Sequence, residues 1–157
     1  MSVVVAATDG SDLAIQAVST GLSLLRPVDT VIIVAVADTV DPSLAEDATG
    51  HAAATMTPAQ VESQHREALS RGRAALEKTV AALQNTGEPL AERMETSVIE
   101  GDPGRALCDF ANDIEATAIV VGSRGLGGIR RAFLGSVSDY VVRNAPCSVV
   151  VTRSPNS

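Results

Sequence analysis

The sequence predicts an α/β protein, a single-domain three-layer α/β/α sandwich built on a five-stranded parallel sheet. Short runs rich in valine and isoleucine alternate with longer amphipathic stretches, turn residues separate the two, and aromatic residues make up only 2% of the chain. Continuous apolar runs are typical of strands buried on both faces, as in a parallel sheet covered by helices. With 157 residues, the chain has the length of one domain.

Five apolar runs are the expected strands. Four of them are short and nearly uninterrupted, whereas the third mixes polar and apolar residues and carries charges that suit the edge of a sheet. The runs are 3–8, 31–37, 91–99, 118–121 and Ser148–Thr152.

Start and stop signals place four helices between these strands. Ser11 or Asp12 can cap the first helix and Asp102 the third, while Pro58 opens the long second helix. The inner stripe expected for this second helix is Val61, Ala68, Gly72, Ala75, Thr79, Val80 and Leu83. The fourth helix is expected to begin at Gly135-Ser136. Residues 38–57 show little periodicity and are expected to form a long loop.

A doubly wound strand order of 3-2-1-4-5 fits this alternation best. It places the first and fourth strands side by side, with outgoing connections that leave to opposite faces of the sheet. Such a switch point opens a crevice at the carboxyl ends of the strands, where ligands of α/β proteins bind. The two segments that carry candidate binding residues, 9–11 and 122–136, directly follow these two strands.

Composition restricts the class of partner. The formal net charge is -7, which does not favour nucleic acid or an anionic membrane, and no apolar run reaches the length of a membrane span. Cys108 and Cys147 suit a reduced, cytoplasmic protein, and we expect both to be small buried hydrophobes. His51 and His65 have no partner at zinc-ligand spacing.

The glycine-rich segment 122–136 is the strongest candidate for a binding site. Gly122 and Gly125 allow backbone N–H groups to approach an anion, because no Cβ stands in the way. Free N–H groups and the helix dipole at Gly135 and Ser136 favour a phosphate. The spacing fits neither a Walker loop nor a dinucleotide fingerprint. The alternative interpretation of this segment is a flexible connection whose glycines serve turn geometry. The alternative interpretation of Asp9 is a turn or capping residue.

These motifs resemble the universal stress protein family, specifically its ATP-binding branch. The loop fits the pattern G-x2-G-x9-G-[ST], and the first strand with its Asp-Gly-Ser turn resembles the start of the family. Segments 101–103 and 145–151 resemble later landmarks. The resemblance covers essentially the whole chain and implies a Rossmann-like domain over residues 1–153 with a tail over 154–157.

The resemblance also implies a site for ATP with Mg²⁺. Asp9 would contact the adenosine part and could help to position Mg²⁺, while Ala7, Thr8 and Val36 would line the adenine pocket, partly through backbone groups. The residues that would hold ribose and phosphates are Gly122, Arg124, Gly125, Gly135, Ser136, Val137 and Ser138.

The expected function is that of a regulatory nucleotide sensor in a stress response, with segment 38–57 as a lid. ATP hydrolysis is expected to be slow at most, since no residue stands out as a general base. Two alternatives remain open: a ligand-free dimeric interaction module, or a binder of another adenine nucleotide such as cAMP. The last strand, Ser148–Thr152, is an uncharged sheet edge, and the resemblance implies a homodimer through it.

Overall fold

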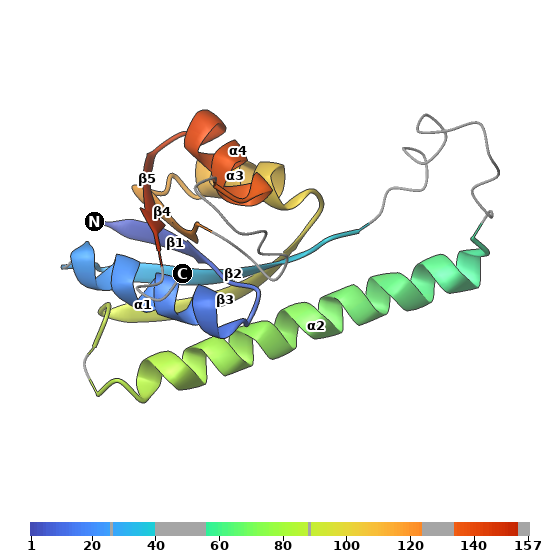
Figure 1. Cartoon of the computed structure of the whole chain (residues 1–157), viewed down its shortest axis with the longest axis horizontal. Coiled ribbons are helices and arrows are strands. Elements are labelled where there is room, and N and C mark those ends of the chain that lie inside the picture. The colour runs from blue at the N-terminus through green and yellow to red at the C-terminus, as the bar shows by residue number, and fades with distance from the viewer. Residues whose placement is uncertain (26, 40–55, 88, 124–133, 154–157) are drawn as a thin grey trace.

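The computed structural model describes residues 1–25, 27–39, 56–87, 89–123 and 134–153, which form strands and helices in strict alternation (Figure 1). The strands are β1 (Val3–Ala7), β2 (Thr30–Ala37), β3 (Arg93–Glu100), β4 (Ala118–Gly122) and β5 (Ser148–Thr152). The helices are α1 (Asp12–Leu24), α2 (Pro58–Gln84), α3 (Pro103–Asp113) and α4 (Ser136–Asn144). Every predicted strand is present, with boundaries within two residues of those expected.

The strands form one parallel sheet in the order β3-β2-β1-β4-β5, which confirms the predicted topology. β1 lies at its centre, where Ala6 pairs with Ile33 on β2 and with Val120 on β4. The charged strand β3 and the apolar strand β5 occupy the two edges, as their sequences indicate.

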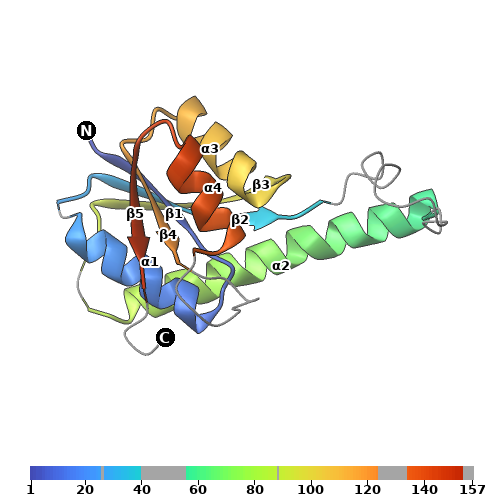
Figure 2. The same ribbon diagram turned by 45° about the horizontal axis from the view of Figure 1, so that its top comes forward.

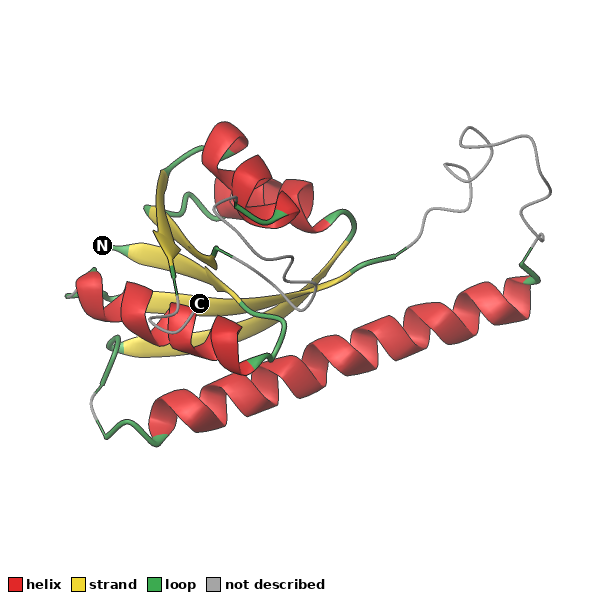
Figure 3. Cartoon of the chain, in the orientation of Figure 1, coloured by secondary structure: helices red, strands yellow, loops and turns green. Residues whose placement is uncertain are grey.

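Alternation along the central strands divides the core into two layers. Val4 and Ala6 of β1 pack with α1 and α2, whereas Val5 and Ala7 pack with α3 and α4. Figures 1 and 2 show these helix pairs on opposite faces of the sheet, and Figure 3 shows the strands between them. No helix in the described part of the chain is long and apolar enough to cross a lipid bilayer.

Side chains cap three of the four helices. Ser11, rather than Asp12, is the cap of α1 and accepts the Ala14 N–H at 3.1 Å. Thr57 and Gln60 form a reciprocal capping box on α2. Asp102 accepts the Arg105 N–H at 3.1 Å on α3, as predicted. α4 differs from the other three, because among the described residues no side chain caps its amino end.

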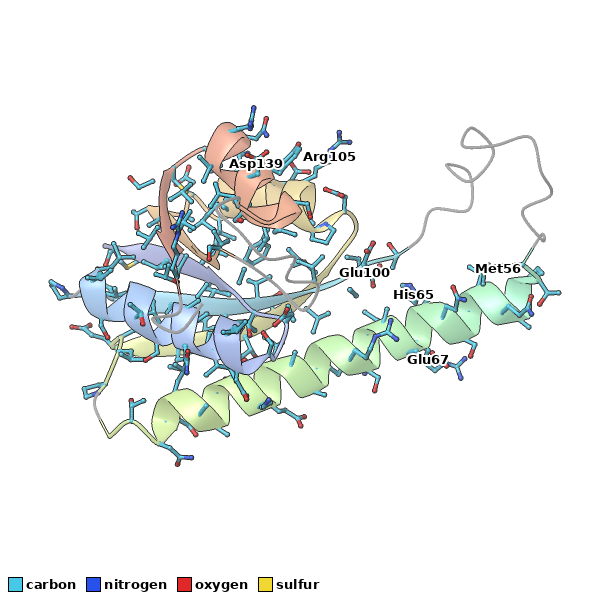
Figure 4. The ribbon with its side chains drawn as sticks, viewed as in Figure 1. Met56, His65, Glu67, Glu100, Arg105 and Asp139 are labelled. Carbon is cyan, nitrogen blue, oxygen red and sulfur yellow. The ribbon has the colours of Figure 1, made fainter. Side chains whose placement is uncertain are left out.

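The long helix α2 extends past the sheet at its amino end (Figures 1 and 2). Within the inner stripe predicted for it, Val61 and Val80 are half-buried and the other members are buried. Leu76, which the predicted stripe did not include, is buried as well. On the projecting part, His65 Nε2 lies 3.5 Å from Glu100 Oε1 (Figure 4). Most of the predicted lid, residues 40–55, lies outside the described residues.

The layer formed by α3 and α4 is closely packed. A Cβ on Gly104 would lie 2.8 Å from Tyr140 Cβ, so only glycine permits this helix contact. Cys108 is buried in this layer, as expected, whereas Cys147 is only half-buried. Burial raises the pKa of both thiols, so neither is poised as a thiolate at neutral pH.

Candidate functional site

The carboxyl ends of β1 and β4 are neighbours at the centre of the sheet. Their register pairs Ala6 with Val120, which brings Thr8 level with Gly122 two residues further along. β1 continues to α1 on one face and β4 leads towards α4 on the other. The predicted switch point is therefore present, at the carboxyl ends of the strands, where α/β proteins bind ligands.

The turn after β1 presents Asp9 to solvent. Asp9 Oδ1 accepts the Ser11 N–H at 2.9 Å, so the carboxylate orients the first residues of the turn. Gly10 has φ +77°, a left-handed conformation that favours glycine. Asp9 thus has both the turn role expected from its sequence context and the exposure needed to contact a ligand.

Thr8 turns its side chain the other way, into the interface with α2. Its hydroxyl lies 2.9 Å from the Thr79 hydroxyl, and both side chains are buried. Its N–H donates to the Val34 carbonyl at 2.9 Å. Any contact of Thr8 with a ligand at this edge would therefore be made by backbone atoms.

Ser123 joins the two ends of the glycine-rich segment. The Gly135 N–H donates to the Ser123 carbonyl at 2.8 Å, and the Ser123 N–H donates to the Thr152 carbonyl at 2.8 Å. The Ser138 hydroxyl donates to the Gly135 carbonyl at 3.0 Å and lies 3.4 Å from the Ser123 carbonyl oxygen. We call these bonds among Ser123, Gly135 and Ser138 the loop neck.

The loop neck holds the amino end of α4 at the carboxyl end of β4. Ser136, the first residue of α4, is exposed there, and Val137 is half-buried. Ser138 is only 2% exposed, so its hydroxyl serves the neck and only its backbone N–H could reach a phosphate. The first N–H groups of a helix have no intrahelical acceptor, which makes this uncapped end suitable for an anion.

The remaining predicted site residues are placed as follows. Ala7 and Val36 are half-buried at the carboxyl ends of β1 and β2, on the side of α3 and α4. Gly122 ends β4 opposite Thr152. Arg124 and Gly125 lie outside the described residues. The structure thus places every predicted site residue that it describes at the carboxyl ends of the central strands.

Three polar residues near this edge were not predicted as part of the site. Ser123 and Thr152 support the loop neck, and the Thr152 hydroxyl also donates to the Ala17 carbonyl of α1 at 3.0 Å. Thr79 was expected only as a member of the inner stripe of α2. The available signal for Thr79 was a hydroxyl residue among apolar and small residues at helical spacing.

The charges near the amino end of α4 are partly balanced. Asp139 in its first turn would repel an anion, but Arg143 lies one turn further on, with Nε 3.1 Å from Asp139 Oδ2. Among the described residues, no three His, Cys, Asp or Glu side chains are grouped so that they could hold a metal ion.

Comparison with known proteins agrees with this architecture. A universal stress protein from Methanocaldococcus jannaschii is 26% identical over 152 residues, which make up 97% of this chain and 82% of the relative. The structure of UspA from Lactobacillus plantarum superposes with a TM-score of 0.76 at 24% identity, over 97% of each chain. A universal stress protein solved in complex with cAMP is 25% identical, with a TM-score of 0.59 over 96% of each chain.

The family model extends the match to nearly all of the sequence. The model of the universal stress protein family matches residues 1–153, which include the nine helices and strands of the described residues and both segments at the switch point. The chain therefore belongs to the universal stress protein family.

Proposed function

We propose that this chain binds an adenine nucleotide, ATP with Mg²⁺, at the carboxyl ends of β1 and β4 and acts as a cytoplasmic regulatory sensor. The observation that carries the proposal is the amino end of α4, which no described side chain caps and which the 2.8 Å bond from Gly135 to Ser123 holds at the end of β4. Backbone N–H groups in this arrangement suit phosphates.

The nucleotide would lie across the two strand ends. Asp9 would contact the adenosine part, and Ala7 and Val36 would border the adenine. The phosphates would lie against Gly122, Ser136, Val137 and Ser138 together with Arg124 and Gly125. Mg²⁺ would be bound mainly by phosphate oxygens. The exposed carboxylate of Asp9 would supply an oxygen ligand from the protein, because Mg²⁺ prefers oxygen ligands. We propose slow hydrolysis at most, because amides and hydroxyls hold phosphates but do not activate water.

Isothermal titration of nucleotide-free protein with MgATP tests this proposal. We expect saturable binding, and Asp9→Asn should weaken it about three- to thirtyfold, because a charged hydrogen-bond acceptor contributes more than a neutral one. Asp12→Asn is the matched control, since Asp12 is exposed three residues away and pairs with Lys78 at 2.9 Å. No binding of MgATP to the unaltered protein would refute the proposal.

A second adenine nucleotide deserves a direct comparison, because the relative with cAMP bound shares 25% identity with this chain. Competition between ATP and cAMP distinguishes the two, since only ATP extends a triphosphate towards α4. If cAMP bound more tightly than ATP, cAMP would be the proposed ligand, at the same site. Failure to bind any adenine nucleotide would favour a ligand-free interaction module.

We also propose a homodimer through β5. This strand is a sheet edge, and its three valines at positions 149–151 are only half-buried against β4 and the helices. An apolar edge with free backbone groups favours pairing with a second chain. Light scattering at micromolar concentration should give twice the mass of one chain, and a monomer under these conditions would contradict the proposal.

A further inference from the structure

A chain of hydrogen bonds connects α2 to the turn that carries Asp9. The Thr79 hydroxyl donates to the Ala75 carbonyl at 2.8 Å, which commits its proton. Its oxygen therefore accepts from the Thr8 hydroxyl at 2.9 Å, and the Thr8 oxygen accepts the Gly10 N–H at 3.1 Å. The direction of every bond is thus fixed from Gly10 to Ala75.

This chain is shielded from water. Thr79 is 0% exposed and Thr8 is 7% exposed, and the surrounding layer between β1, β2 and α2 is otherwise apolar. A valine at position 79 would fill nearly the same volume but would carry no hydroxyl. Removing the Thr79 oxygen would deprive the Thr8 hydroxyl of its acceptor in a place that water does not reach, and buried hydroxyls without partners are destabilising.

Gly10 contacts α2 directly as well. A Cβ built on Gly10 would lie 2.8 Å from Ala75 Cα and 2.9 Å from Ala75 Cβ. The turn therefore rests on the helix backbone one turn before Thr79, while the hydroxyl chain sets the orientation of the Gly10 peptide. Because Asp9 and Gly10 are adjacent, the position of the carboxylate depends on this peptide.

We propose that Thr79 is a positioning residue for the nucleotide site, acting through Thr8 on the Asp9-Gly10 turn. The inference rests on the proposed function and extends it, because it makes α2 part of the binding apparatus. Nucleotide binding and the placement of α2 are then coupled, and the coupling is reciprocal.

The test compares Thr79→Val, which keeps the shape and removes the hydroxyl, with Thr79→Ser, which keeps the hydroxyl. Thr79→Val should raise the Kd for MgATP about three- to tenfold, the effect of losing one buried hydrogen bond. Thr79→Ser should stay within about twofold of the unaltered protein. Once Thr8→Val is present, Thr79→Val should add little, because both act through one chain.

Two further measurements separate positioning from stability. Leu83→Ala removes a buried side chain from the same helix and should cost more stability than Thr79→Val, yet leave the Kd unchanged. In nucleotide-free protein, Thr79→Val should shift the Gly10 amide resonance and speed its hydrogen exchange, whereas Thr79→Ser should not.

The outcomes distinguish this inference from the proposed function. Unaltered protein that binds no MgATP refutes both. Binding that Thr79→Val leaves intact, that Thr79→Ser weakens equally, or that Leu83→Ala weakens as much, overturns the positioning role alone.

Discussion

Gly10→Ala is expected to lower the free energy of unfolding by about 2–4 kcal/mol, which combines backbone strain with overpacking. An L-residue at φ +77° is strained, and the new Cβ would lie 2.8 Å from Ala75 Cα. That atom belongs to the backbone of α2, so it cannot move aside as a flexible side chain would. Urea denaturation of the two proteins measures the difference.

Gly87→Ala separates the two causes. Gly87 has a similar φ of +73°, but a Cβ there would meet none of the described residues within 4 Å, so only the strain of about 1–2 kcal/mol is expected. Equal losses for the two variants would show that contact with α2 does not constrain the Asp9 turn.

Gly135→Pro is expected to open the loop neck and to weaken MgATP binding at least tenfold, or about 1.4 kcal/mol. Proline fits the observed φ of −64° at this position but has no N–H to donate to the Ser123 carbonyl. The amino end of α4 would then be held at the end of β4 only through the longer contact of the Ser138 hydroxyl with the Ser123 carbonyl, at 3.4 Å. Isothermal titration and urea denaturation measure the two effects.

Gly135→Ala is the matched variant, because alanine accepts the same φ and keeps the N–H. It should retain the neck bond, and its affinity should lie between those of the unaltered protein and Gly135→Pro. If the two variants bind MgATP equally, the bond from Gly135 to Ser123 does not organise the site.

The fold could be predicted because its determinants are local or follow from general topology. Apolar runs define the strands, and caps such as Asp102 with Pro103 define helix starts, as the structure confirms. The strand order follows from parallel crossovers together with the placement of both polar turns at one switch point. The uncertain choice between Ser11 and Asp12 concerned adjacent residues with equal capping potential.

The support of the candidate site could not be predicted in the same way. Thr8 and Thr79 are 71 positions apart, and helical periodicity gives Thr79 a buried position without naming its partner. The loop neck likewise depends on Thr152 at the end of a distant strand. The same applies to Ser138, whose sequence position suggests a phosphate contact, whereas its buried hydroxyl closes the neck.

A titration of ¹⁵N-labelled protein with MgATP, followed through backbone amide resonances, tests the central claim most directly. Binding at the switch point should shift the amides of Gly10, Ser11, Gly122, Ser136 and Val137. The amides of Thr30 and Thr117 should stay in place, because they lie at the amino ends of the strands, where they donate to the Ser2 and Val3 carbonyls. Shifts concentrated at Thr30 and Thr117, or no shifts at saturating MgATP, would contradict a nucleotide site between β1 and β4.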